Sequence, residues 1–224
     1  YTYLILNLRS GVEGKDTKDT IAAIHKAAKN YYEEHYLTGE AAGYLNLEEI
    51  TSRDFTRVSV ISVLLIALIL VITFRSIILP LILVFVIELG IWINLSIPYF
   101  EGLELNFISF IIIGAIQLGA TVDYAILFTS RYKENLIELR PTEAMVQTIK
   151  DTGRSVMTSA LILMAGTFSV SFITTIRSAS ELTLLIGRGA LISLILVYML
   201  LPALLLLLSK PIKLTTWGWP EIKK

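Results

Sequence analysis

The sequence lacks cysteine altogether, contains only two histidines among its 224 residues and has a formal net charge of zero. The absence of cysteine excludes disulfide bonds and thiolate metal sites. The two histidines, His25 and His35, both lie in the polar N-terminal segment, and we interpret them as isolated, solvated surface residues. The zero net charge gives no sign of a nucleic-acid partner, and we expect none.

Charged residues are also scarce, at 17% of the chain, whereas 54% of the residues are hydrophobic. The charges concentrate in residues 9–57, 131–154 and 210–224, and the sequence between these ranges is nearly free of charge. This distribution is typical of an integral membrane protein rather than of a soluble protein. A spanning helix needs about 20 mostly apolar residues to cross about 30 Å of hydrocarbon. Five segments meet this requirement, namely residues 58–74, 77–97, 107–129, 156–176 and 182–208.

Lysine and arginine in the short loops predict the orientation of these spans. If the N-terminal segment lies outside, Arg177 is the only cation of the outer loops. The inner loops and the tail, residues 211–224, then hold most of the others: Arg75, Arg131, Lys133, Arg140, Lys150, Arg154, Lys210, Lys213, Lys223 and Lys224. We therefore expect a multi-pass protein of the cell membrane with its N-terminal segment extracytoplasmic and its C-terminus cytoplasmic, although Arg53 and Arg57 favour the opposite orientation.

Residues 1–54 have the pattern of the end of a larger α/β domain. Residues 1–8 suit a strand, and a helix around residues 17–34 can be capped by Asp16 or Thr17. One strand and one helix cannot form a stable sheet domain, so the rest of that domain is expected outside this chain. Further on, Asn46 with Glu49 resembles a capping box. A helix beginning there would run into the first span without a break, or would be a short surface helix followed by a loop.

The lengths of the connections between spans predict how neighbouring spans are arranged. Phe74, Arg75 and Ser76 join the first two spans in an antiparallel hairpin, as residues 177–181 join the last two. Residues 130–155 form a longer inner connection, in which we expect an amphipathic helix over residues 141–152. Pro141 can start this helix and Gly153 can end it, and it would lie on the inner membrane surface.

Three ionisable residues fall inside the spans: Glu88, Asp123 and Arg188. Such residues usually face the protein interior and are functional candidates. Ala115, Gly119 and Asp123 follow one another at intervals of four residues, so the acid ends a face of small residues that another helix can approach closely. Asp123 is either a buried acid held for packing or, as we favour, a carboxylate that takes up and releases protons.

Several polar residues lie at depths where they could assist these ionisable groups. Tyr124 could supply a hydroxyl to a proton relay with Asp123, and Thr121, Thr158 and Ser159 are candidate supporting groups. Glu88 and Arg188 lie near enough in depth to form an intramembrane ion pair, with Gln117 at a similar level. We expect that ion pair to be structural rather than part of transport, and we expect no metal site.

The stretch GATVDYAILFTSRYKENL resembles the fourth transmembrane helix of the resistance-nodulation-cell division (RND) superfamily, in its MMPL (mycobacterial membrane protein large) branch. There an Asp-Tyr pair is followed by an Arg-aromatic pair. FRSIILPLILV is similar to the hairpin between the second and third helices, GRSVMTSALILMAGTFSVSF to the fifth helix and ELTLLIGRGALISLILVYMLLPALLLL to the sixth. The resemblance covers residues 55–210, and the ending is similar to the C-terminal repeat of members from Gram-positive bacteria.

The resemblance implies a five-helix half-bundle that follows the end of an extracytoplasmic porter domain. It implies further that proton flow through Asp123 and Tyr124 drives the export of lipids or other lipophilic molecules, with the proton gradient in place of a cofactor. The expected partners are membrane lipids, the lipophilic substrate and the other repeat of the same protein, with a second copy or accessory subunits as further candidates. Glu88 and Arg188 do not belong to the family motif.

Other functions share parts of this pattern. A protein-translocation accessory of the SecD/SecF type has the same helical arrangement, but the Asp-Tyr pair followed by SRY argues against it. A sensor or scaffold resembling sterol-sensing domains also uses this five-helix unit and would show no dependence on protons. An intramembrane aspartyl protease needs two facing aspartates, whereas only Asp123 lies within a span and no GxGD motif is present. We therefore expect a transporter rather than an enzyme.

Overall fold

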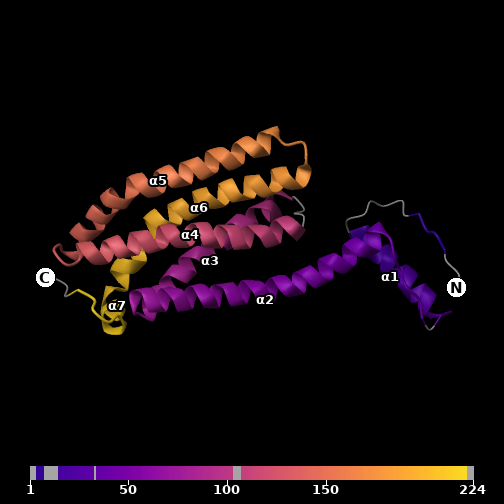
Figure 1. Ribbon diagram of the computed structural model, residues 1–224, viewed down its shortest axis with the longest axis horizontal. Helices are drawn as coiled ribbons and strands as arrows, with labels where there is room; N and C mark the ends of the chain where they lie inside the picture. Colours follow the sequence, from indigo (N-terminus) through magenta and orange to yellow (C-terminus); the bar gives the residue numbers. More distant parts are fainter. Residues whose placement is uncertain (1–3, 8–14, 33, 103–106, 221–224) are drawn as a thin grey trace. The chain divides into compact units, whose positions relative to one another are not determined.

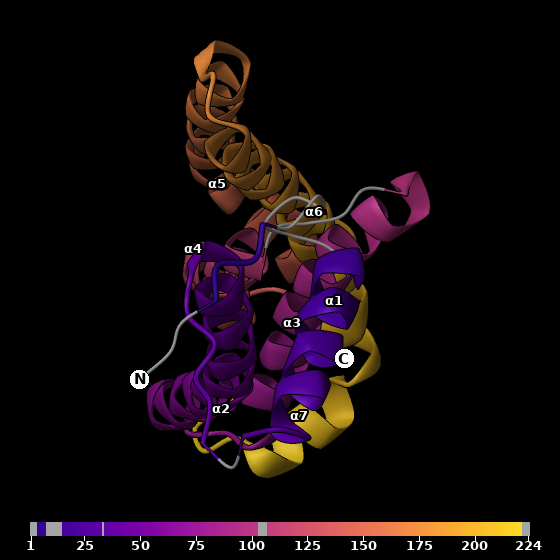
Figure 2. The same ribbon diagram turned by 90° about the vertical axis from the view of Figure 1, so that its right-hand side faces the viewer.

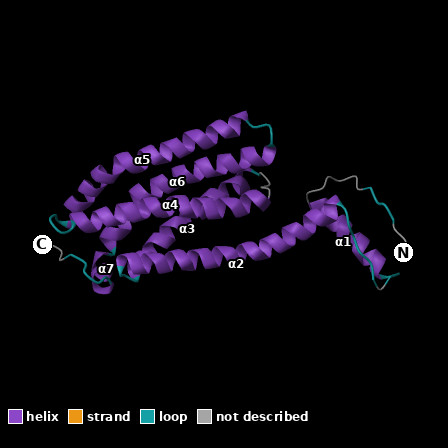
Figure 3. Cartoon of the chain, in the orientation of Figure 1, coloured by secondary structure: helices purple, strands orange, loops and turns teal. Residues whose placement is uncertain are grey.

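The structure is a computed structural model that describes residues 4–7, 15–32, 34–102 and 107–220. These residues form seven helices and, in the same ranges, no strand (Figure 1, Figure 3). The chain divides into two compact units, Tyr1–Val58 (unit 1) and Ser59–Lys224 (unit 2), which are described separately.

Unit 1 contains helix α1, Lys15–Lys29, close to the range predicted for the first helix. The predicted strand is wrong for residues 4–7, which are not in a strand, and its other residues lie outside those described. A strand is stabilised by hydrogen bonds to a neighbouring strand, and the described part of the chain offers none. The two histidines are not isolated as we expected, because His35 Nε2 lies 3.0 Å from His25 Nδ1.

Helix α2, Glu40–Phe74, is one unbroken helix. Of the two alternatives predicted for this segment, the helix that runs into the first span without a break is therefore the one present. It begins six residues before Asn46, and the boundary between the two units falls within it at Val58. Within unit 2, only its last turns are buried, where Leu70 and Phe74 join the core. Most of the other apolar side chains of this span are exposed, although Ile66 is half-buried against the core, as expected of a helix that faces lipid or a further part of the protein on its other sides.

In the described ranges, five helical segments are long and apolar enough to cross a membrane. They are Arg53–Phe74 of α2, Ile78–Glu101 (α3), Ile112–Asn135 within α4 (Phe107–Asn135), Pro141–Ile173 (α5) and Arg177–Leu207 (α6). These segments match the five predicted spans in order. The prediction of a mainly α membrane protein with five spanning helices is confirmed, and the chain is a multi-pass membrane protein.

Helix α6 is the centre of unit 2, since it packs against α3, α4 and α5 (Figure 1, Figure 2). Glycine permits one of these contacts, because a Cβ at Gly187 would lie 2.6 Å from Thr167 Oγ1 and 2.9 Å from the Phe168 ring. Closer to the α5–α6 turn, Ser171 and Ser180 join the two helices by hydrogen bonds. The hydroxyl of Ser180 donates to the Ser171 carbonyl at 2.9 Å, and the Ser171 hydroxyl donates to the Ser180 carbonyl at 3.2 Å.

The amphipathic helix predicted over residues 141–152 is not a separate element. Helix α5 continues from Pro141 to Ile173, and Gly153 lies inside it. Glycine in a helix interior costs only about 1 kcal/mol, which packing can outweigh. Here the buried side chains of Ala144, Met145, Thr148 and Thr152 anchor the first turns, so the prediction that Gly153 ends the helix is wrong.

The residues expected to form the C-terminal tail begin with a short helix, α7, Ser209–Thr215, and fold back onto the α2–α3 turn. Ser76 and Thr216 form an isolated antiparallel bridge, and the Trp217 amide donates to the Arg75 carbonyl at 3.0 Å. Arg75 has a φ of 49°, a left-handed conformation that reverses the chain between the two spans. The predicted hairpin between the first two spans is therefore present, with the C-terminal residues packed against its turn.

Candidate functional site

Helix α4 carries the candidate proton-relay residues, and its faces differ sharply in burial. Gln117, Thr121 and Phe128 are buried against neighbouring helices. In contrast, Ala115, Gly119 and Asp123 are exposed, and a Cβ at Gly119 would meet nothing within 4 Å. The face of small residues predicted from the sequence is therefore real, but within the described part of the chain no helix covers it.

Asp123 has no hydrogen-bond or ion-pair partner among the residues described, although it lies in a spanning helix. The next residue, Tyr124, is turned about 100° around the helix and is only 9% exposed. Its hydroxyl donates to Ser159 Oγ of α5 at 3.5 Å. Of the predicted relay residues, the structure thus brings Tyr124 and Ser159 together and leaves the Asp123 carboxylate on the uncovered face.

The other two candidate relay residues have different partners. Thr158 is exposed, and its hydroxyl donates to the Arg154 carbonyl of its own helix at 2.7 Å. Thr121 lies about 160° from Asp123 around α4. Its hydroxyl bonds the Gln117 carbonyl at 2.7 Å and lies 2.8 Å from Ser193 Oγ of α6. Neither hydroxyl forms a hydrogen bond with the Asp123 carboxylate in the described residues.

Arg188 does not pair with Glu88, and this prediction is wrong for the structure. The Arg188 side chain bonds Asn94 of α3, from Nε to Oδ1 at 2.9 Å and from Nη2 to the backbone carbonyl at 3.0 Å. Among the described residues, its ion-pair partner is Glu101, with Arg188 Nη1 3.8 Å from Glu101 Oε2. Glu88 lies about 120° from Asn94 around α3, so it points toward a different side from the helix that carries Arg188.

A buried polar network continues from Asn94 into α4 and α6. Asn94 Nδ2 donates to Gln117 Oε1 and to the Leu185 carbonyl, both at 2.9 Å. Gln117 Nε2 in turn reaches Ser193 Oγ at 3.4 Å and the Gly189 carbonyl at 3.5 Å. The predicted proximity of Gln117 and Arg188 is thus mediated by Asn94. Sequence reasoning missed Asn94, although an amide within an apolar span was a signal for it.

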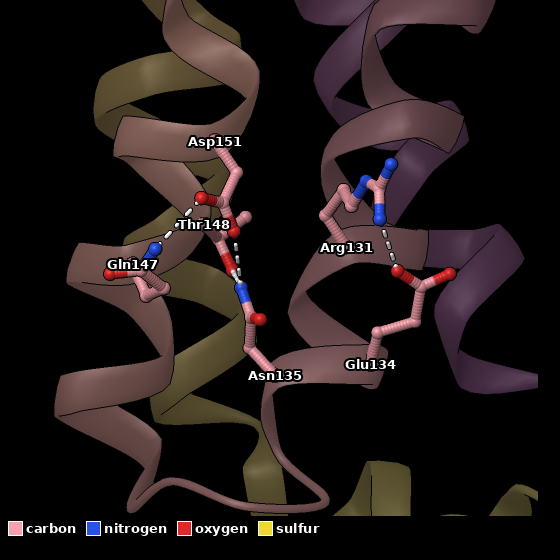
Figure 4. A network of polar contacts seen from close by, with 6 residues as sticks. All are labelled: Arg131, Glu134, Asn135, Gln147, Thr148 and Asp151. Atoms are coloured by element: carbon pink, nitrogen blue, oxygen red, sulfur yellow. Dashed lines mark hydrogen bonds and ion pairs between the residues drawn. The ribbon is translucent and has the colours of Figure 1, made fainter.

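A second polar network joins the last turn of α4 to the first turns of α5 (Figure 4). Asn135 Nδ2 donates to Thr148 Oγ1 at 3.1 Å and to Asp151 Oδ2 at 3.2 Å, and Gln147 bonds the same carboxylate at 2.8 Å. Beside it, Arg131 and Glu134 form an ion pair at 2.7 Å. These contacts fix the α4–α5 turn and satisfy Asp151. The described ranges hold no group of three or more histidine, aspartate or glutamate side chains suited to a metal ion.

The fold and this arrangement define a multi-pass membrane protein with a carboxylate on α4 that has no partner among the described residues. The chain belongs to the MMPL family, whose model matches residues 1–224. This agrees with the family resemblance seen in the sequence.

Individual relatives cover the same region. The chain is 30% identical over 178 residues to ActII-3 of Streptomyces coelicolor, named as a membrane protein, covering 77% of this chain and 24% of the relative. It is 28% identical over 220 residues to MmpL3 of Mycobacterium leprae, named as a trehalose monomycolate exporter, covering 94% and 22%. It is 26% identical over 190 residues to MmpL6 of Mycobacterium tuberculosis, named as a transport protein, covering 82% and 46%. The chain therefore spans less than half the length of each of these relatives.

Proposed function

We propose that this chain is part of an exporter of lipids or other lipophilic molecules, driven by the proton-motive force. Asp123 and Tyr124 form its intramembrane proton relay, and Ser159 supports Tyr124. The observation that carries this proposal is the Asp123 carboxylate, which lies in a spanning helix with no partner in the described residues. The names of relatives such as MmpL3 and MmpL6 support a transport function.

The relay follows from the cost of a charge at membrane depth. An ionised aspartate in the middle of a bilayer is unfavourable by about 2.5–3.5 kcal/mol on insertion scales. A carboxylate without a cation lowers that cost by binding a proton, and it releases the proton when water or a polar group reaches it. The Tyr124 hydroxyl, bonded to Ser159 Oγ on one side of α4, is the nearest group along the chain that can exchange a proton with it.

The uncovered face of α4 supports a further part of this proposal. Ala115, Gly119 and Asp123 leave room for another helix to approach closely. We assign that place to the other repeat of the same protein, which would bring its own polar groups to Asp123. The relay would then be shared between the two repeats, and a proton could load only when both halves adopt the matching arrangement.

The substrate class and the orientation belong to the same proposal. The name of MmpL3 suggests an acylated sugar or a similar lipophilic molecule as the exported substrate. The residues that select the substrate would lie mainly in the extracytoplasmic porter domain, of which unit 1 would be the end. The concentration of lysine and arginine at residues 131–154 and 210–213 supports a bacterial cell membrane with that end of the bundle cytoplasmic.

The test uses the full-length protein in proteoliposomes with an imposed pH gradient. An entrapped pH-sensitive dye reports proton flux, and a fluorescent acyl trehalose serves as the transported probe. Asp123→Asn keeps the shape of the side chain and removes the titratable proton, so we expect it to abolish gradient-driven flux and transport. Glu143→Gln, an exposed acid in the first turn of α5, is the matched control and should behave as wild type. Gradient-driven transport that survives Asp123→Asn would contradict the relay.

A further inference from the structure

The C-terminal segment, defined here as residues 209–220, is held firmly on the end of unit 2. Ile212 is fully buried and Trp219 is 9% exposed, with its ring centroid 6.5 Å from that of Tyr132. The Thr216 hydroxyl donates to Ser76 Oγ at 2.7 Å, and both side chains are buried. These contacts fix one face of the segment against the α2–α3 turn and the end of α4.

The opposite face of the C-terminal segment combines apolar and basic side chains. Leu214 is 87% exposed and Trp217 is 82% exposed. Lys210 and Lys213 are also exposed. In α7, Lys210 and Leu214 lie about 160° from the buried Ile212, so the segment is amphipathic and its outward face is not involved in folding unit 2.

The position of Trp217 along the membrane normal follows from its backbone contact. Arg75 and Ser76 form the turn between two spanning helices, so they lie where the hydrocarbon ends. The Trp217 amide donates to the Arg75 carbonyl, so Trp217 lies at the same level. Figure 1 shows α7 at the end of unit 2 where α2 ends and α3 begins. Tryptophan is enriched at this boundary, where its ring is apolar and its N–H is solvated.

We propose that the outward face of the C-terminal segment is a binding surface for anionic membrane lipids. Leu214 and Trp217 insert at the boundary between headgroups and acyl chains, and Lys210 and Lys213 bind lipid phosphates. The charge of the surroundings is complementary to such lipids. Arg75 is exposed in the adjoining turn, and the C-terminal segment, with Lys210 and Lys213, contains no acidic residue. Each lysine or arginine near an anionic surface strengthens binding roughly fivefold.

Tryptophan fluorescence in lipid nanodiscs tests this inference on the full-length protein. The difference between wild type and Trp217→Phe isolates the emission of Trp217, whatever other tryptophans are present. In nanodiscs of brominated phosphatidylglycerol we expect this component to be quenched strongly. The component isolated in the same way with Trp219→Phe is the matched control, because Trp219 is buried against Tyr132 and should be quenched little. Absence of quenching of Trp217 would overturn the proposal.

The lysines provide the test of lipid charge. The test uses nanodiscs of mixed brominated phosphatidylcholine and phosphatidylglycerol at low salt. A double variant that carries both Lys210→Gln and Lys213→Gln should have a ratio of quenched to unquenched Trp217 about 25-fold lower than wild type, because each lysine contributes roughly fivefold. Lys29→Gln on α1 should leave the ratio unchanged. Equal quenching in pure phosphatidylcholine and in phosphatidylglycerol would overturn the assignment to anionic lipids. Quenching of Trp217 that appears only on dilution of the protein would show instead that a second copy covers this face, which also overturns it.

Discussion

Arg188 of α6 and Asn94 of α3 are joined by two hydrogen bonds, from Nε to Oδ1 at 2.9 Å and from Nη2 to the Asn94 carbonyl at 3.0 Å. Asn94 is fully buried, and its amide nitrogen continues the network to Gln117 of α4. One asparagine side chain therefore connects three spanning helices. A guanidinium at membrane depth is costly by itself, and here its donors are satisfied mainly by this residue rather than by a carboxylate.

Replacing Asn94 by leucine should destabilise the bundle. The substitution keeps a similar volume but leaves Arg188 Nε and Gln117 Oε1 without partners. Because breaking a buried charged hydrogen bond and leaving the charge unpaired is expensive, we expect a loss of about 2–4 kcal/mol in the free energy of unfolding. Reversible unfolding of the purified protein in mixed micelles measures it.

Glu88→Gln is the matched control for Asn94→Leu, because Glu88 lies in the same helix and makes no ion pair with Arg188 in the described residues. Its effect on unfolding should stay within about 0.5 kcal/mol, as for substitutions outside a packed network. If Glu88→Gln proved as damaging as Asn94→Leu, the ion pair predicted from the sequence would be present after all.

The Glu88 prediction shows what the sequence could and could not determine. Apolar length placed all five spans in order. Depth alone does not fix which side of a helix faces which neighbour. That depends on how α3 and α6 pack, and here Gly189 brings α6 close enough for Asn94 to reach the backbone at Leu185. Two opposite charges within the spans therefore predicted the wrong partner, because Arg188 bonds Asn94, about 9 Å along α3 from Glu88.

Gly189→Ala should be destabilising because the site has no room for a methyl group. A Cβ there would lie 2.6 Å from Gln117 Oε1 and 2.8 Å from Asn94 Nδ2, and both side chains are held by hydrogen bonds. Overpacking of this kind costs about 1–3 kcal/mol. Gly153→Ala in α5 meets nothing within 4 Å and should instead stabilise by about 0.5–1 kcal/mol through helix propensity. Reversible unfolding in mixed micelles measures both changes in the free energy of unfolding, which should have opposite signs. No change for Gly189→Ala would argue against the close contact at Gly189.

Ser159→Ala should weaken proton-driven transport, whereas Thr158→Val should not. The Ser159 hydroxyl is the partner of Tyr124, while the Thr158 hydroxyl is satisfied within its own helix. Loss of one hydrogen bond of about 0.5–1.5 kcal/mol corresponds to a rate reduction of about two- to tenfold. Gradient-driven flux in proteoliposomes measures the rates of both variants. Equal effects of the two substitutions would mean that the Tyr124–Ser159 contact does not serve the relay.

Gly119→Leu tests whether another part of the protein covers α4. In this chain Gly119 is exposed with nothing within 4 Å, so leucine there should be tolerated if the face meets lipid. If a second helix packs closely on that face, as proposed, leucine should abolish transport and lower the thermal unfolding midpoint. Gly166→Leu, at an equally open position in α5, is the control and should be neutral. A neutral Gly119→Leu in the full-length protein would contradict the closely packed partner.

The small-residue face illustrates a further limit of sequence reasoning. The spacing of Ala115, Gly119 and Asp123 predicted a surface for close helix approach, and the structure leaves this surface open. A pattern of small residues indicates that a partner helix fits, but it does not say which helix fits there. The five spans of this chain use their own glycines at Gly187 and Gly189 for contacts within unit 2, and the α4 face remains for another segment.

Thr129→Val should stabilise the protein, in contrast to the same substitution at Thr148. Both side chains are fully buried. Among the described residues the Thr129 hydroxyl has no hydrogen-bond partner, whereas the Thr148 hydroxyl donates to the Ala144 carbonyl at 2.7 Å and accepts from Asn135 at 3.1 Å. Removing an unsatisfied buried hydroxyl relieves a desolvation cost of about 1–3 kcal/mol, so Thr129→Val should raise the free energy of unfolding. Thr148→Val should lower it by about 1 kcal/mol, because Asn135 loses an acceptor. A destabilising Thr129→Val would show that its hydroxyl bonds a group outside this chain.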